Sequence, residues 1–79
     1  METVQLGSID IGGGIVATTA RFSEAGPIVL VTTHATTGRE QNSRLDMQKG
    51  MFIDPLPGTR KLEGINLLVS RVMGRFKAA

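Results

Sequence analysis

Residues 9–14 read IDIGGG, and this stretch decides how the first half of the chain folds. It lies between two segments rich in β-forming residues, at about 3–11 and 14–22. Only glycine adopts positive φ freely, so three consecutive glycines favour a tight turn that reverses the chain. The sequence therefore predicts a β-hairpin centred on these glycines.

The first of these segments breaks its alternation of apolar and polar residues once. The break falls between Leu6 and Ile9, where Gly7 and Ser8 stand next to each other. A β-bulge adds a residue to one strand and so returns the later apolar side chains to the same face. We therefore expect a bulge at Gly7 and Ser8.

A third strand is predicted at about 28–35, after a turn at residues 23–27. Short connections favour sequential antiparallel pairing, which gives a three-stranded meander. If Phe22 opposes Ile28, the same register sets four pairs in all: Phe22 with Ile28, Ala20 with Leu30, Thr18 with Thr32 and Val16 with His34. A slip of one residue would invert the faces.

The middle of the chain leaves two alternatives open. Residues 36–42 are polar and indicate a loop. Within 43–54, Ser43 could cap a short helix over 44–49 that ends at Gly50. Alternatively, Lys49 and Gly50 form the turn of a hairpin. The helix is the preferred interpretation, and the prolines that follow Asp54 indicate a stiff connector.

The clearest periodicity predicts an amphipathic helix over about 60–77, with Thr59 as its N-cap. At about 100° per residue its apolar side chains fall within an arc of about 140°. Those side chains are Leu62, Ile65, Leu68, Val69, Val72, Met73 and Phe76. Such a helix needs a sheet to cover, so we expect a single α+β domain over 1–79, with the helix packed on the meander.

Composition excludes several classes of protein. The chain has 79 residues, one histidine and no cysteine, so a disulfide framework, a thiolate metal site or a histidine-paired nucleophile is not expected. His34 alone is a weak candidate for a general base, and no cofactor is predicted. Without a signal-like or membrane-spanning segment, we expect a cytoplasmic chain. A homodimer is one way for so small a chain to complete its core.

The IDIGGG stretch resembles the strand–DxGGG–strand phosphate hairpin of the actin-like ATPase superfamily. The resemblance implies that Asp10 would lie near a metal ion and Gly12 to Gly14 would approach nucleotide phosphates. The family usually has Thr or Ser after the glycines, where this chain has Ile15 and Val16, and it uses two large lobes. The hairpin turn is the preferred interpretation, and phosphate binding at Gly12 to Gly14 is kept as a remote alternative.

Positive charge gathers in the second half, where residues 39–79 carry a formal charge of +4. On the predicted helix three arginines lie within about 60° of each other, opposite the apolar arc. Two more in the polar segment before the helix could extend this face. The predicted binding residues are Arg39, Arg44, Arg60, Arg71 and Arg75. They would meet an acidic protein surface or nucleic acid, unless they are simply a solvated helix face.

No catalytic set stands out, so the sequence predicts a non-enzymatic binding protein. Its expected partner is a larger protein or nucleoprotein assembly, and an inhibitor of the phage anti-defence (anti-CRISPR) type is one instance suggested by size alone. The alternative is a small basic nucleic-acid-binding protein, although the chain has only three Phe and no Trp or Tyr to stack on bases.

Overall fold

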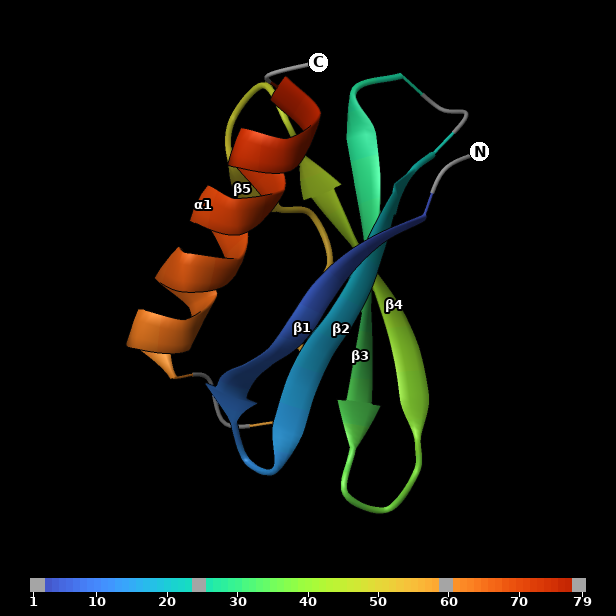
Figure 1. The fold of residues 1–79 in the computed structure, drawn as a ribbon, viewed down its shortest axis with the longest axis vertical. Coiled ribbons are helices and arrows are strands. Elements are labelled where there is room, and N and C mark those ends of the chain that lie inside the picture. Colours follow the sequence, from blue (N-terminus) through green and yellow to red (C-terminus); the bar gives the residue numbers. More distant parts are fainter. Residues whose placement is uncertain (1–2, 24–25, 59–60, 78–79) are drawn as a thin grey trace.

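A computed structural model describes residues 3–23, 26–58 and 61–77. They form an antiparallel sheet with one helix packed on it, so the expected α+β class is confirmed (Figure 1). The strands follow one another in sequence order across the sheet. In chain order the elements are β1 (Thr3–Gly12), β2 (Ile15–Phe22), β3 (Ile28–Ala35), β4 (Glu40–Asp46), β5 (Met51–Phe52) and α1 (Leu62–Lys77).

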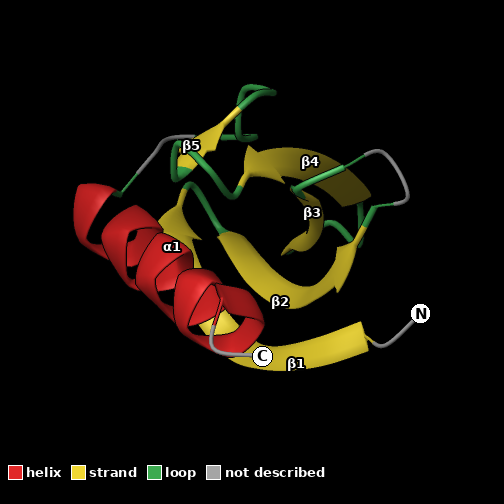
Figure 2. Cartoon of the chain, turned by 90° about the horizontal axis from the view of Figure 1, so that it is seen from above, coloured by secondary structure: helices red, strands yellow, loops and turns green. Residues whose placement is uncertain are grey.

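The sheet curls strongly, and α1 lies along its open side (Figure 2). Side chains from the inner face of the sheet meet Leu68 and Val72 of α1, which are fully buried. At one end of this core the rings of Phe22 and Phe76 pack edge to face, with their centroids 4.6 Å apart. The other members of the core are Leu6, Ile9, Ile11, Ile15, Ala17, Ala20, Val29, Val31, Leu45 and Leu56.

The glycine stretch forms the turn between β1 and β2. Gly12 pairs with Ile15, and the two residues between them, Gly13 and Gly14, have φ of 64° and 72°. Positive φ at both central residues is the mark of a type I′ turn, whose twist suits a two-residue hairpin. The amide of Gly12 also donates to Asp10 Oδ1 at 2.9 Å. The predicted hairpin is therefore present at the predicted glycines.

The predicted bulge in β1 is confirmed. Gln5 lies opposite Thr19 and Ile9 lies opposite Ala17, so β1 holds extra residues between them. As a result Leu6 and Ile9 are both buried although three positions separate them.

A second irregularity lies at Thr18 of β2, between the pairs Ala17–Thr33 and Thr19–Thr32, and it makes part of the predicted register wrong. Val16 faces His34 as expected, but Ala20 faces Val31 and Phe22 faces Val29. The extra residue shifts the pairing by one beyond Thr18 and turns the buried side from Ala17 to Ala20.

The predicted helix over 44–49 is wrong, and so is the loop over 36–42 from Glu40 onward. Residues 40–46 form β4 instead, and the meander has five strands rather than three. Only Ser43 and Leu45 of β4 face the core, so its apolar alternation is too short to reveal a strand. A turn at residues 47–50 leads into β5, where Asp46 Oδ1 accepts hydrogen bonds from the amides of Gln48 and Lys49. The hairpin alternative was therefore correct in kind, although its turn spans residues 47–50 rather than Lys49 and Gly50 alone.

The C-terminal helix is confirmed from Leu62. The carbonyl of Lys61 accepts the first helical bond, from Ile65, and the amide of Lys61 donates to the carbonyl of Ile11 at 2.7 Å. The expected N-cap, Thr59, lies outside the described residues. Within the described ranges, no helix is long and apolar enough to cross a membrane.

Candidate docking surface

The face of helix α1 that packs on the sheet is not centred on the helix's apolar stripe. Its buried positions are Gly64, Leu68 and Val72, which recur every four residues along one line of the helix. That line is displaced by about 70° from the centre of the apolar arc, at about 100° per residue. Gly64 explains the displacement, because the backbone of Asp10 and Ile11 passes against its Cα with no space for a Cβ. The sheet therefore covers one side of the stripe and leaves the other side uncovered.

The less covered side of the stripe includes four apolar residues beside Phe76, which packs on Phe22. Leu62 is 72% exposed, while Ile65, Val69 and Met73 are only partly buried. We call these four residues the open stripe. Water contacts apolar area there that an ordinary surface helix would bury against its own domain.

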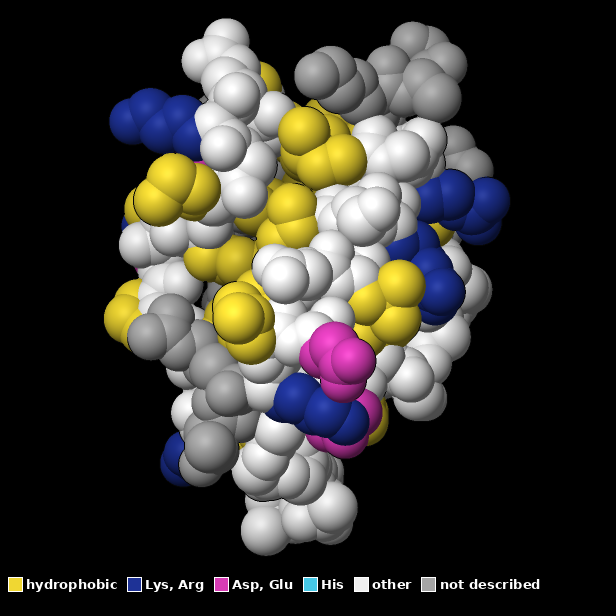
Figure 3. Space-filling model, turned by 90° about the vertical axis from the view of Figure 1, so that its left-hand side faces the viewer, with side chains coloured by type: hydrophobic (Ala, Val, Ile, Leu, Met, Phe, Trp, Pro, Cys, Tyr) yellow, Lys and Arg dark blue, Asp and Glu magenta, His cyan; other side chains and the backbone are white. Residues whose placement is uncertain are grey.

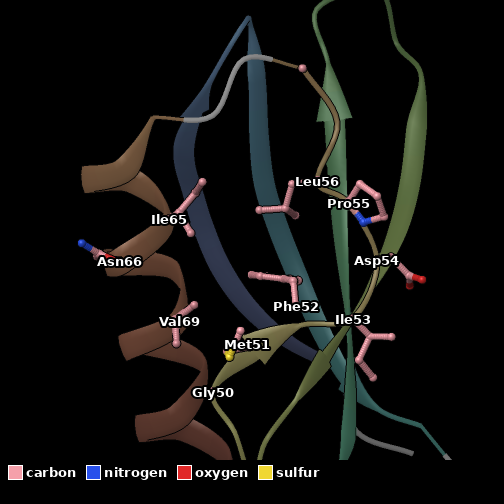
Figure 4. Close-up of a pocket in the computed structure, with 11 residues that line it drawn as sticks. Gly50, Met51, Phe52, Ile53, Asp54, Pro55, Leu56, Ile65, Asn66 and Val69 are labelled. Atoms are coloured by element: carbon pink, nitrogen blue, oxygen red, sulfur yellow. The ribbon is translucent and has the colours of Figure 1, made fainter.

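The open stripe borders a groove of about 820 Å³ between α1 and the chain from Gly50 to Gly58. Phe52 and Leu56 extend into it from one side, and Ile65 and Val69 face them from α1 (Figure 4). On the rim, Met51 is 65% exposed. Hydrophobic side chains gather on this face of the molecule (Figure 3). Side chains of this kind form the centre of many protein–protein interfaces.

The groove is electrically neutral along its described lining. Its one ionisable residue is Asp54, and Arg44 binds both oxygens of that carboxylate, through Nε at 3.0 Å and Nη2 at 2.9 Å. The backbone amide of Arg44 donates to the same carboxylate at 2.9 Å. The Arg44 side-chain hydrogen bonds, followed by this amide bond, lower the pKa of Asp54 to about 2. The ion pair therefore leaves no free charge at the groove.

The five predicted binding arginines do not form one patch in the described structure. Arg44 is held by Asp54, and the Arg71 guanidinium donates to the carbonyl of Leu6 at 2.8 Å. Arg39 lies at the β3–β4 turn and Arg75 in the last turns of α1, at opposite ends of the molecule (Figure 1). Arg60 lies outside the described residues. Their role in binding stays a prediction.

Other polar candidates have structural partners. Asp10 accepts from Gly12 and pairs with Lys61 Nζ at 3.3 Å, and the Gly12 amide first, then Lys61, lower the pKa of Asp10. The carboxylate that the actin-like resemblance would place near a metal therefore stabilises the turn. His34 Nε2 lies 3.8 Å from Glu40 Oε2. Among the described residues, no group of three or more His, Cys, Asp or Glu is arranged to hold a metal ion.

Comparison with known proteins finds no matching family model, no similar curated protein and no similar solved structure. Function is therefore inferred from this chain's own surface. The groove was not among the sites predicted from the sequence. No local pattern in the sequence marked it, because an apolar arc of about 140° is ordinary for a helix packed on a sheet.

Proposed function

We propose that this chain is a non-enzymatic binding protein that docks on a larger protein or nucleoprotein assembly through the groove and the open stripe. One observation carries the proposal: a groove without free charge, with apolar side chains on both walls, lies beside the part of the helix stripe that the sheet leaves partly uncovered. Docking that covers a working surface of the assembly would inhibit it, as an anti-CRISPR protein does.

The apolar side chains around the groove can supply the binding energy. Burying one large apolar side chain contributes roughly 1.5–3 kcal/mol. Leu62 and Met51 are mostly exposed, and Ile65 and Val69 are partly so. A few such anchors supply several kcal/mol together, and the part that exceeds the cost of association appears as binding free energy.

A matched pair of variants tests the proposal. Val69→Glu puts a charge on the groove wall, whereas Leu67→Glu puts the same charge on another part of α1 that lies outside the groove and is 48% exposed. After chemical cross-linking in lysate of the native cell, wild type and Leu67→Glu should capture the same partner, and Val69→Glu should lose it. Equal capture by all three chains would refute docking at the groove.

The nucleic-acid alternative is supported by the charge of +4 over residues 39–79. It predicts a complex with DNA or RNA at low salt that weakens steeply as salt rises. A gel-shift experiment with wild type and with Arg39→Glu/Arg75→Glu tests it. No shift by the wild-type chain at low salt would exclude this alternative.

A further inference from the structure

The two edges of the sheet differ. On β1, the guanidinium of Arg71 binds the carbonyl of Leu6 and the amide of Lys61 binds the carbonyl of Ile11. Helix α1 and the residue before it thus occupy two of the carbonyls of that edge. On the other side, β5 is the last strand of the sheet and pairs only with β4 among the described strands.

The backbone N–H and C=O of Phe52 are not used by the pairing of β5 with β4. The amide of Ile53 donates to the carbonyl of Arg44 in β4 at 2.8 Å, and successive residues of a strand direct their backbone groups to alternate sides. The N–H and C=O of Phe52 therefore point away from β4, and Figure 4 shows α1 across the groove from β5. Among the described residues these two groups have no hydrogen-bond partner, and an unpaired donor and acceptor on an edge strand form a template for another strand.

We propose that the groove receives a short extended segment of the partner protein, which pairs with Phe52 as a sixth strand and packs its inward side chains on Ile65 and Val69. This inference rests on the proposed function and names the form of the partner. An added strand uses both the backbone of β5 and the apolar wall of α1, whereas a bound helix would leave the Phe52 groups unpaired.

The surroundings of β5 define the chemistry of this segment. Asp54 is held by Arg44, so charge complementarity calls for uncharged side chains in the groove. The turn at residues 47–50 limits the ladder on one side, and Pro55, which has no N–H, limits it on the other. The segment therefore has only a few paired residues, with apolar side chains at alternate positions facing α1.

Panning short random displayed peptides against the wild-type chain tests this inference. Enriched peptides should show apolar residues at alternate positions, and their binding should fall at least tenfold with Val69→Glu but not with Leu67→Glu. In the complex, amide hydrogen exchange of Phe52 should slow by at least about tenfold, because its N–H gains a partner in the added strand.

The failures of the two proposals are distinguishable. Peptides with helical spacing and an unprotected Phe52 amide would overturn the added strand and leave docking at the groove intact. Peptides that bind Val69→Glu as well as wild type would count against the groove itself, and so against both proposals. Absence of any enriched peptide would overturn the added strand, while cross-linking still decides docking. If sedimentation shows a dimer that Val69→Glu dissociates, the occupant is a second copy, and the partner segment is refuted.

Discussion

Adding a single methyl group at Gly64, by Gly64→Ala, should destabilise this protein, although the same change favours helices in general. Gly64→Ala gains about 1 kcal/mol of helix propensity. However, the new Cβ would occupy the space of the Asp10 carbonyl oxygen, 2.9 Å from the Asp10 carbonyl carbon and 3.4 Å from the Ile11 Cα. These are backbone atoms of β1, so no side-chain rotation relieves the overlap and α1 must move away.

The cost follows from what α1 holds in place. Leu68 and Val72 of α1 are fully buried against the sheet, and a gap of about 0.5–1 Å between helix and sheet forfeits a quarter to a half of their contact energy. With roughly 1.5–3 kcal/mol for each side chain, this loss is about 1–3 kcal/mol, and forced overpacking costs about 1–3 kcal/mol more. After the gain in propensity we expect a net loss of about 1–5 kcal/mol, which lowers Tm by at least about 5 °C for a domain of this size.

Urea unfolding followed by far-UV circular dichroism measures this loss, since the chain has no Trp or Tyr for fluorescence. Gly74→Ala is the matched control, because no atom lies within 4 Å of a Cβ at that position of the same helix. It should stabilise the protein by up to about 1 kcal/mol. The two substitutions are thus expected to change the free energy of unfolding in opposite directions. A Gly64→Ala protein as stable as wild type would refute the close approach of α1 to β1.

Three further predictions concern the sheet. Ser43 Oγ is buried without a hydrogen-bond partner among the described residues, so Ser43→Ala should stabilise the fold by about 1 kcal/mol. The control Thr33→Val removes the bond from Thr33 Oγ1 to the Gln41 carbonyl and should not stabilise it. A less stable Ser43→Ala protein would show that the hydroxyl has a partner. Gly13→Val should lower the free energy of unfolding by about 1–3 kcal/mol, because a β-branched residue resists positive φ. Gly13→Asn should be tolerated, because asparagine is common in a type I′ turn. Equal melting temperatures for the two variants would exclude that turn. The pKa of Asp54 falls from 3.8 to about 2 on folding, so the contribution of this carboxylate to stability is complete above about pH 4 and is lost as pH falls toward 2. The difference in urea midpoint between wild type and Asp54→Asn should therefore shrink over that interval. A constant difference would argue against the pairing with Arg44.

The predictable parts of the fold are those with strong local signals. Three glycines with positive φ gave the hairpin, and the interruption at Gly7 and Ser8 gave the bulge. Strand β4 was missed because only Ser43 and Leu45 face inward, and one of these is polar. The second bulge, at Thr18, has no glycine to mark it. Local sequence does not reveal which residue of two strands is left unpaired.

The site was harder to predict than the fold, for a physical reason. The sequence shows which residues of α1 are apolar, but the rotation of the helix about its own axis depends on where another backbone comes closest. Here that point is Gly64, a residue that propensity alone treats as a weakness of the helix. The roll brings Arg71 to the carbonyl of Leu6 and leaves Leu62 uncovered. Arg71 and Arg75 remain exposed on α1, so the arginine surface predicted from the helical wheel stays a prediction beside the groove that the roll leaves open.

The different edges of the sheet also limit how far this protein can aggregate. Growth into a fibre by strand pairing needs two free edges on every molecule, because each unit must accept a neighbour on both sides. The Arg71 guanidinium and the Lys61 amide occupy two carbonyls of β1 and so oppose strand pairing on that side. A molecule that pairs at β5 would therefore lack an equally accessible second edge on β1, which disfavours growth into a fibre.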